Sequence, residues 1–173
     1  MTDAYVQAHA GTVIFDRSHC AKLEISGADH ISFLHNILSQ DISGMKKGEW
    51  RDAALLSATS HVLAYMHAVC LDNSVVLVSV PGSFEKIKGL LEKFIITEDV
   101  TIREASDWKF FEVWDGAKAP HFKLSKQELV GDIFKDENAR EILRIENGLL
   151  EYGPDFNENF MLSETRLEKN RCK

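Results

Sequence analysis

The chain has 173 residues, of which 45% are hydrophobic and 27% charged, as is usual for a globular protein with a packed core. Its 20 basic and 27 acidic residues give a net charge of −7, and such a surface repels a phosphate backbone, so nucleic-acid binding is disfavoured. No stretch approaches the ~18 apolar residues of a membrane span, and residues 1–10 lack the basic, apolar pattern of a signal peptide. We therefore expect a cytoplasmic protein that does not insert into a membrane.

Cysteine and histidine spacing argues against a metal centre. Cys20, Cys70 and Cys172 lie far apart and in no CxxC pair, which excludes a disulfide framework and suits a reducing compartment. His61 and His67 share the face of a predicted strand, but six residues at ~3.3 Å each separate them by about 20 Å, too far for one ion. We expect no metal site.

Apolar periodicity and turn residues predict alternating strands and helices. In chain order we expect a strand ending at 26, a helix over 28–38, an antiparallel meander over 53–56, 62–69 and 75–80, a helix over 84–94, two paired strands over 100–103 and 110–114, a loop or edge over 116–126, a helix over 136–147 and a last helix starting near 163. Ser26 and Asp29 fit an SxxD helix cap. This order favours a split β-α-β arrangement.

These elements predict an α+β fold with mixed or antiparallel sheets and packed helices. Residues 1–173 make one domain, with room for two closely packed sub-domains of about 1–115 and 116–173. The chain lacks a phosphate-binding GxxxxGK loop, a dinucleotide-binding GxGxxG, a nucleophile elbow GxSxG and a zinc-binding HExxH. Acid–base chemistry would fall to aspartates whose spatial relation one sequence leaves open: Asp16, Asp29, Asp41 and Asp52.

Three blocks of sequence carry a resemblance. The first contains ISGAD (residues 25–29), FL (33–34) and SQDI (39–42), the second contains Gly48, LLS (55–57) and VL (62–63), and the third contains RIENGL (144–149), YG (152–153) and Asp155. In this order and spacing they resemble the glycine-cleavage T-protein (aminomethyltransferase) family and its YgfZ-type folate-binding relatives. The resemblance covers about residues 20–172 and implies the fold of that family's folate-binding domain.

The resemblance also implies a ligand and its contacts. In the family a reduced folate, tetrahydrofolate or a derivative, occupies a central cavity and a glutamate grips the pterin ring. Glu146 stands at that position, and a carboxylate can accept two N–H bonds from a 2-amino-4-oxo pterin. The other expected contacts are Arg144, which has an acidic side chain as its alternative partner, Tyr65 and Asp52. The competing interpretation of Glu146 is a surface or capping carboxylate near a helix end.

The chain departs from the family at its chemical centre. A strand aspartate assists one-carbon transfer in the T-protein, and Tyr65 occupies the matching position here, so we expect no aminomethyltransferase activity. The glycine and basic residue of the family's GR turn are replaced by Ser60 and His61, which removes a permissive backbone position. Of the YgfZ-type motif near the C-terminus only Cys172 matches, and the C-terminal barrel domain of longer relatives is absent. Cys172 is either a redox thiol, activated by neighbouring basic residues, or a cysteine without a role.

Three functions compete on this basis. The first is a non-catalytic, folate-binding accessory protein that supports iron–sulfur enzyme maintenance or one-carbon metabolism. The second is a remnant of the fold used for protein contacts, with its cavity filled by side chains such as Tyr65. The third, an active aminomethyltransferase with a relocated base, requires a replacement for the missing aspartate.

Overall fold

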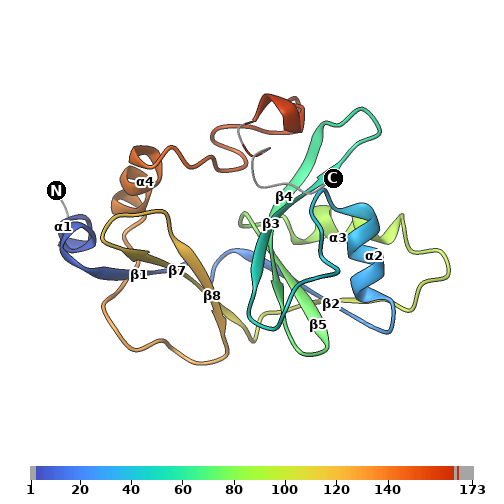
Figure 1. The fold of residues 1–173 in the computed structure, drawn as a ribbon, viewed down its shortest axis with the longest axis horizontal. Helices are drawn as coiled ribbons and strands as arrows, with labels where there is room; N and C mark the ends of the chain where they lie inside the picture. Colours follow the sequence, from blue (N-terminus) through green and yellow to red (C-terminus); the bar gives the residue numbers. More distant parts are fainter. Residues whose placement is uncertain (1–2, 166, 168–173) are drawn as a thin grey trace. The chain divides into compact units, whose positions relative to one another are not determined.

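The computed structural model describes residues 3–165 and 167 and divides into two compact units (Figure 1). Unit 1 is drawn from Met1–His19 and Ser106–Leu150, and unit 2 from Cys20–Ala105 and Glu151–Lys173. Each unit has its own sheet and its own core, and the expected α+β class with mixed and antiparallel sheets is confirmed. The sub-domain boundary near residue 115 stays a prediction. Within the described residues, every helix is too short or too polar to cross a membrane.

Unit 1 is a four-stranded sheet of order β8-β7-β1-β9 with two helices on one face. Its elements are α1 (Asp3–Ala10), β1 (Thr12–Asp16), β7 (Lys109–Asp115), β8 (His121–Ser125), β9 (Ile133–Phe134) and α4 (Glu137–Glu146). Strand β7 pairs antiparallel with β1 and β8, whereas β9 runs parallel to β1. Ala8 of α1 and Leu143 of α4 pack against Phe15 and Trp114 of the sheet in one buried cluster.

Unit 2 is a five-stranded antiparallel sheet of order β3-β4-β5-β2-β6 with helices α2 and α3 on one face (Figure 1). Its elements are β2 (Ala21–Ser26), α2 (His30–Ile37), β3 (Trp50–Leu56), β4 (Val62–Cys70), β5 (Ser74–Ser79), α3 (Phe84–Glu92), β6 (Thr101–Glu104) and the 3-10 turn η1 (Leu162–Glu164). Leu34 of α2 and Leu91 of α3 are fully buried against Leu23 and Leu77 of the sheet.

Strand β4 separates the two faces of this sheet by simple alternation. Ala64 and Met66 point into the core beneath the helices, while Tyr65 and His67, which alternate with them along the strand, are only half-buried. Because successive side chains on a strand point to opposite faces, Tyr65 and His67 lie on the face away from α2 and α3, which we call the outer face.

The predicted meander and the predicted helices over 28–38, 84–94 and 136–147 are present, with differences in detail. The strands over 100–103 and 110–114 do not pair: β6 joins β2 at the edge of unit 2, and β7, apolar on both faces, is an inner strand of unit 1. The SxxD cap does not form either, because the side chain of Asp29 accepts instead from the amide of Asp99 at 2.8 Å.

The inward face of α4 is formed by the buried residues Ala139, Leu143 and Arg144, whereas Ile142 and Ile145 are 46% and 61% exposed. The last helix near 163 is reduced to the single turn η1 in the described residues. Three elements were not predicted: α1, β1 and β9.

Candidate functional site

Two titratable side chains meet on the outer face of unit 2. Asp52 of β3 lies opposite His67 of β4 in the strand register, and its Oδ1 atom is 2.6 Å from Nδ1 of His67. The side chains are 22% and 24% exposed, so both are partly accessible to solvent. The pair is therefore a fixed polar group on a partly open surface.

A continuous run of rings surrounds this pair, and we call it the aromatic row. The His67 ring lies edge-on to Trp50 and to Tyr65, each with ring centroids 6.0 Å apart. Tyr65 in turn lies 5.6 Å from Phe156, which lies 5.4 Å from Tyr152, again edge-on. Such T-shaped pairs are the favoured geometry for aromatic side chains. The row thus gives the outer face a rigid, apolar strip beside a carboxylate.

The Tyr65 phenol is held in its neutral form. Burial is the largest cause, and the charge of Asp52 with a hydrogen bond to it adds to the effect, so the pKa of the Tyr65 phenol lies well above its ordinary value of 10. A neutral phenol can donate a hydrogen bond but cannot accept a proton as a carboxylate does. Near neutral pH the Tyr65 side chain therefore offers a hydrogen-bond donor.

The segment carrying Tyr152 and Phe156 is tied to the rest of unit 2 by hydrogen bonds. The Tyr152 hydroxyl lies 3.1 Å from the carbonyl oxygen of Leu63 and 3.0 Å from Oε2 of Glu158. The ammonium group of Lys86 lies 3.3 Å from the same carboxylate and 5.7 Å from the centre of the Tyr152 ring. These contacts fix the end of the aromatic row to β4 and α3.

Glu146, the expected pterin ligand, is the last residue of α4 in unit 1. Its carboxylate accepts a hydrogen bond from the Tyr5 hydroxyl at 2.7 Å and lies 3.8 Å from Nε2 of His9, and the side chain is 44% exposed. The bond raises the pKa of the Tyr5 phenol. Within its unit Glu146 therefore links α4 to α1, and its role toward a pterin stays a prediction.

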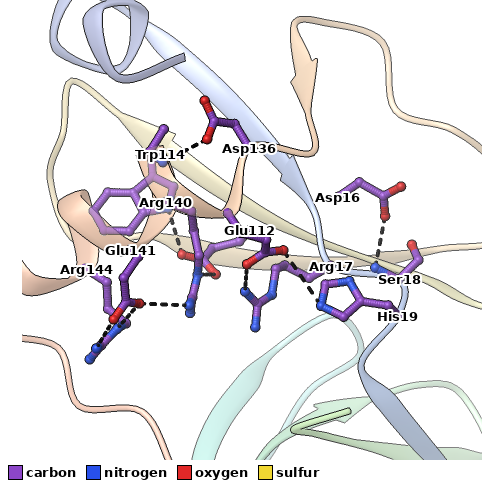
Figure 2. Close-up of polar contacts among 12 residues, drawn as sticks. Asp16, Arg17, Ser18, His19, Glu112, Trp114, Asp136, Arg140, Glu141 and Arg144 are labelled. Atoms are coloured by element: carbon purple, nitrogen blue, oxygen red, sulfur yellow. Dashed lines mark hydrogen bonds and ion pairs between the residues drawn. The ribbon is translucent and has the colours of Figure 1, made fainter. Parts of the chain in front are cut away.

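Arg144 belongs to a network of charges in unit 1 (Figure 2). Its buried guanidinium forms two bonds with Glu141, of 2.6 and 2.8 Å, and a third with the carbonyl oxygen of Leu149. Glu141 also lies 3.7 Å from Arg140. The acidic partner that the sequence left open for Arg144 is therefore Glu141, and its expected contact with folate stays a prediction.

The same network contains a carboxylate that the sequence analysis missed. Glu112 lies in the middle of β7 and is 2% exposed, with its oxygens bound by the Trp114 indole and the Arg140 guanidinium (Figure 2). In the same unit, Arg17 lies 2.6 Å from the carboxylate of Glu137, and His19 lies 3.7 Å from that carboxylate. The sequence did contain a signal for this site, since Glu112 stands inside the apolar run FFEVW. A charged residue in a buried strand requires a partner, so this position could have been predicted to form an ion pair.

The remaining candidates concern thiols and metals. Cys20 and Cys70 are buried, and Cys172 lies outside the described residues. Among residues 3–165 and 167, no three His, Cys, Asp or Glu side chains gather in a group that could hold a metal ion.

Comparison with known proteins gives relatives in one class. No protein-family model matches the chain. The chain is 27% identical over 124 residues to a putative chloroplastic transferase of Arabidopsis thaliana, which covers 70% of this chain and 29% of the relative. It is 30% identical over 118 residues to an aminomethyltransferase of Bacillus licheniformis, and this alignment covers 66% of this chain and 31% of the relative. The chain thus spans about three tenths of the length of these relatives.

A solved structure establishes the fold. Glycine cleavage system aminomethyltransferase T from Bartonella henselae matches 98% of this chain and 60% of its own, with a TM-score of 0.78 and 18% identity. The chain therefore has the mixed α+β fold of that aminomethyltransferase. Membership of the YgfZ-type branch stays a prediction.

Proposed function

We propose that this chain binds a reduced folate, with the outer face of unit 2 as a contact surface, and does not transfer aminomethyl groups. The aromatic row beside the Asp52–His67 pair is the observation that carries the proposal. A pteridine is a flat heteroaromatic ring with a polar edge, and it needs an apolar surface for the ring and fixed polar groups for the edge. The outer face offers both within one sheet.

The absence of transferase chemistry rests on Tyr65. The T-protein relies on a carboxylate at this position, and the raised pKa of the phenol keeps Tyr65 neutral in the range where enzymes of this kind work. Phe156 packs edge-on against the Tyr65 ring, with ring centroids 5.6 Å apart, which holds the phenol in this position. Binding without transfer is the function that these two facts favour.

Calorimetry with 5-formyltetrahydrofolate tests the proposal. We expect binding in the wild-type chain and a loss of about tenfold or more for Trp50→Ala, since removing one stacked ring costs roughly 1–3 kcal/mol. Phe122→Ala is the matched control: Phe122 stacks on Phe110 in unit 1, so its loss removes an aromatic contact without touching the outer face. Absence of heat at high micromolar ligand overturns the proposal.

The role of Glu146 has a separate test. If Glu146 grips the pterin as the resemblance implies, Glu146→Gln weakens binding about tenfold or more, because a charge-assisted bond is worth roughly 1.5–3 kcal/mol. Tyr5→Phe removes the hydroxyl that donates a hydrogen bond to Glu146. It is therefore the control for damage to the contact between α1 and α4. Unchanged affinity in Glu146→Gln would leave Glu146 as the link between the two helices and nothing more.

Two further parts of the proposal concern the cell. We propose that the folate-bound chain supports an iron–sulfur or one-carbon enzyme in the cytoplasm, and that its client is a protein. Cells that carry Trp50→Ala in place of the wild type should then show reduced activity of such an enzyme. If Trp50→Ala abolishes folate binding in vitro but the client enzyme stays fully active in these cells, the alternative of a folate-independent protein-contact module is favoured. The packing of Phe156, 2% exposed, on Tyr65 is what supports that alternative.

A further inference from the structure

Helix α4 ends in a Schellman cap that places an asparagine directly before a glycine. The amide of Gly148 donates to the carbonyl oxygen of Ile145 at 3.0 Å, and the amide of Leu149 donates to that of Arg144 at 3.0 Å. Such a cap requires a left-handed residue after the helix, and Gly148 has a φ of 64°. The way the helix ends therefore gives a physical reason for the pair Asn147–Gly148.

An Asn–Gly pair is chemically reactive because glycine has no side chain to shield its amide nitrogen. When the Gly148 nitrogen attacks Cγ of Asn147, a new N–Cγ bond closes a cyclic imide and the Cγ–Nδ2 bond breaks. Nδ2 leaves as ammonia and carries away the proton of the Gly148 amide. Water then opens the imide: opening at Cγ gives aspartate, and opening at the backbone carbonyl carbon gives isoaspartate. Water is the one co-reactant, and both residues are exposed to it.

The folded chain holds both reacting groups in hydrogen bonds. The side-chain amide of Asn147 donates to the carbonyl oxygens of Leu143 at 2.8 Å and of Ala117 at 3.1 Å. The amide of Gly148 is engaged in the cap. Leu149 adds an apolar anchor, because it packs on the buried cluster that α1 and α4 form with the sheet of unit 1. Ring closure therefore requires the last turn of α4 to open first.

We propose that Asn147 is a deamidation site that the fold keeps closed, and that its conversion makes an opening of the end of α4 irreversible. A carboxylate at this position can only accept, so it loses both bonds of the amide and faces the carbonyl oxygens of Leu143 and Ala117 instead. It also adds negative charge beside Glu146 at the C-terminal end of a helix, which the helix dipole disfavours. Isoaspartate further lengthens the main chain within the cap. The inference does not depend on ligand binding.

Peptide mass spectrometry of the full chain, kept in mildly alkaline buffer with and without urea, tests the site. The mass gain from exchanging NH2 for OH at Asn147 should appear about tenfold or more slowly in the folded chain than in the urea-unfolded chain. Leu149→Ala weakens the cap and should speed the reaction of the folded chain about threefold or more.

Leu129→Ala is the matched control for this measurement. Leu129 is also a half-buried leucine of unit 1, but it packs on a different cluster, so its truncation should leave the reaction rate of the folded chain at the wild-type value. Equal rates with and without urea, no reaction at Asn147 in urea, or a rate for Leu149→Ala no faster than for Leu129→Ala overturns the proposal.

One substitution at each end of α4 tests the consequence of the reaction. Asn147→Asp reproduces the aspartate product and should lower the midpoint of thermal unfolding by roughly 2–4 °C or more and speed hydrogen exchange at the Gly148 amide. Asn138→Asp makes the same chemical change in the first turn, where the dipole favours negative charge, and should leave the midpoint unchanged or raise it. An Asn147→Asp chain as stable as the wild type, with Gly148 equally protected, overturns the claim that the reaction makes the opening irreversible.

Discussion

Arg140 of α4 donates from its Nε atom to Oε2 of Glu112 on β7, at 3.0 Å, with 11% and 3% of the two side chains exposed. The second Glu112 oxygen accepts from the Trp114 indole at 2.8 Å. A carboxylate this deeply buried is tolerated because both oxygens are bound and its charge is balanced. The helix and the sheet of unit 1 are thereby joined by one desolvated ion pair.

We predict that Arg140→Met lowers the free energy of unfolding by about 3–5 kcal/mol, because it leaves Glu112 charged, buried and short of a partner. The double variant Glu112→Met, Arg140→Met should recover most of that loss, since no charge remains in the interior. Urea unfolding measures both. As control, Lys47→Met breaks an ion pair whose side chains are 69% and 65% exposed, and should change stability by less than about 1 kcal/mol. A double variant no more stable than the single one would contradict the argument.

Local patterns in the sequence predicted the elements better than their partners. The meander of β3, β4 and β5 was predictable because polar turns separate apolar runs, and short connections make neighbours in sequence into neighbours in space. The pairing of β6 with β7 failed because their strand patterns are compatible with a hairpin, while their true partners, β2 for one strand and β1 and β8 for the other, are brought together by the fold. The pairing of strands that lie far apart in the sequence cannot be predicted from the residues of either strand alone.

The candidate site shows the same contrast between single residues, which the sequence indicates, and contacts between distant residues, which it does not. Tyr65 and Asp52 were found through family resemblance, whereas the contact between Asp52 and His67 depends on the register of β3 against β4. A shift of one residue would have put the two on opposite faces. Phe156 lies 91 residues from Tyr65 along the chain, and no periodicity relates them. Contacts set by register and by long loops therefore required the structure.

Gly27, in the first block of the family resemblance, has a steric reason to be glycine. Its φ is +111°, and a β-carbon added there would lie 2.1 Å from the carbonyl oxygen of Asp99. We predict that Gly27→Ala destabilises unit 2 by roughly 3 kcal/mol or more, because backbone must move and the conformation is itself strained. Gly89→Ala is the control: it lies within α3 with open space around it, and should stabilise by about 0.5–1 kcal/mol. Thermal unfolding of a well-folded Gly27→Ala protein at the wild-type temperature would refute the steric account.

Ser60 adopts a left-handed backbone conformation of the kind that glycine favours. The turn between β3 and β4 survives, since Ser60 has a φ of 64° and its amide donates to the carbonyl of Ser57 at 3.0 Å. A non-glycine residue in the left-handed region costs roughly 1–2 kcal/mol of folding free energy. Glycine would remove this strain, but its greater conformational freedom in the unfolded chain cancels part of the gain. Ser60→Gly should therefore raise stability by about 0.5–1 kcal/mol in urea unfolding. Ser60→Ala keeps the β-carbon and should give no such gain, so equal stabilisation by both would point to loss of the hydroxyl instead.

The three tyrosines of the chain, Tyr5, Tyr65 and Tyr152, predict how the protein responds to alkali. The pKa of each phenol is raised, that of Tyr65 most, by burial and then by the charge of Asp52. Since the unfolded chain releases these protons near pH 10 and the folded chain holds them to higher pH, the stability they contribute is complete below pH 10 and declines as pH rises beyond it. The phenolate absorbance of Tyr65 should thus appear together with loss of fold rather than before it. Tyr65→Phe should flatten the fall of stability with pH and remove one of the three phenolate signals; phenolate formation by all three tyrosines in a fully folded chain near pH 10 would contradict the buried, neutral Tyr65.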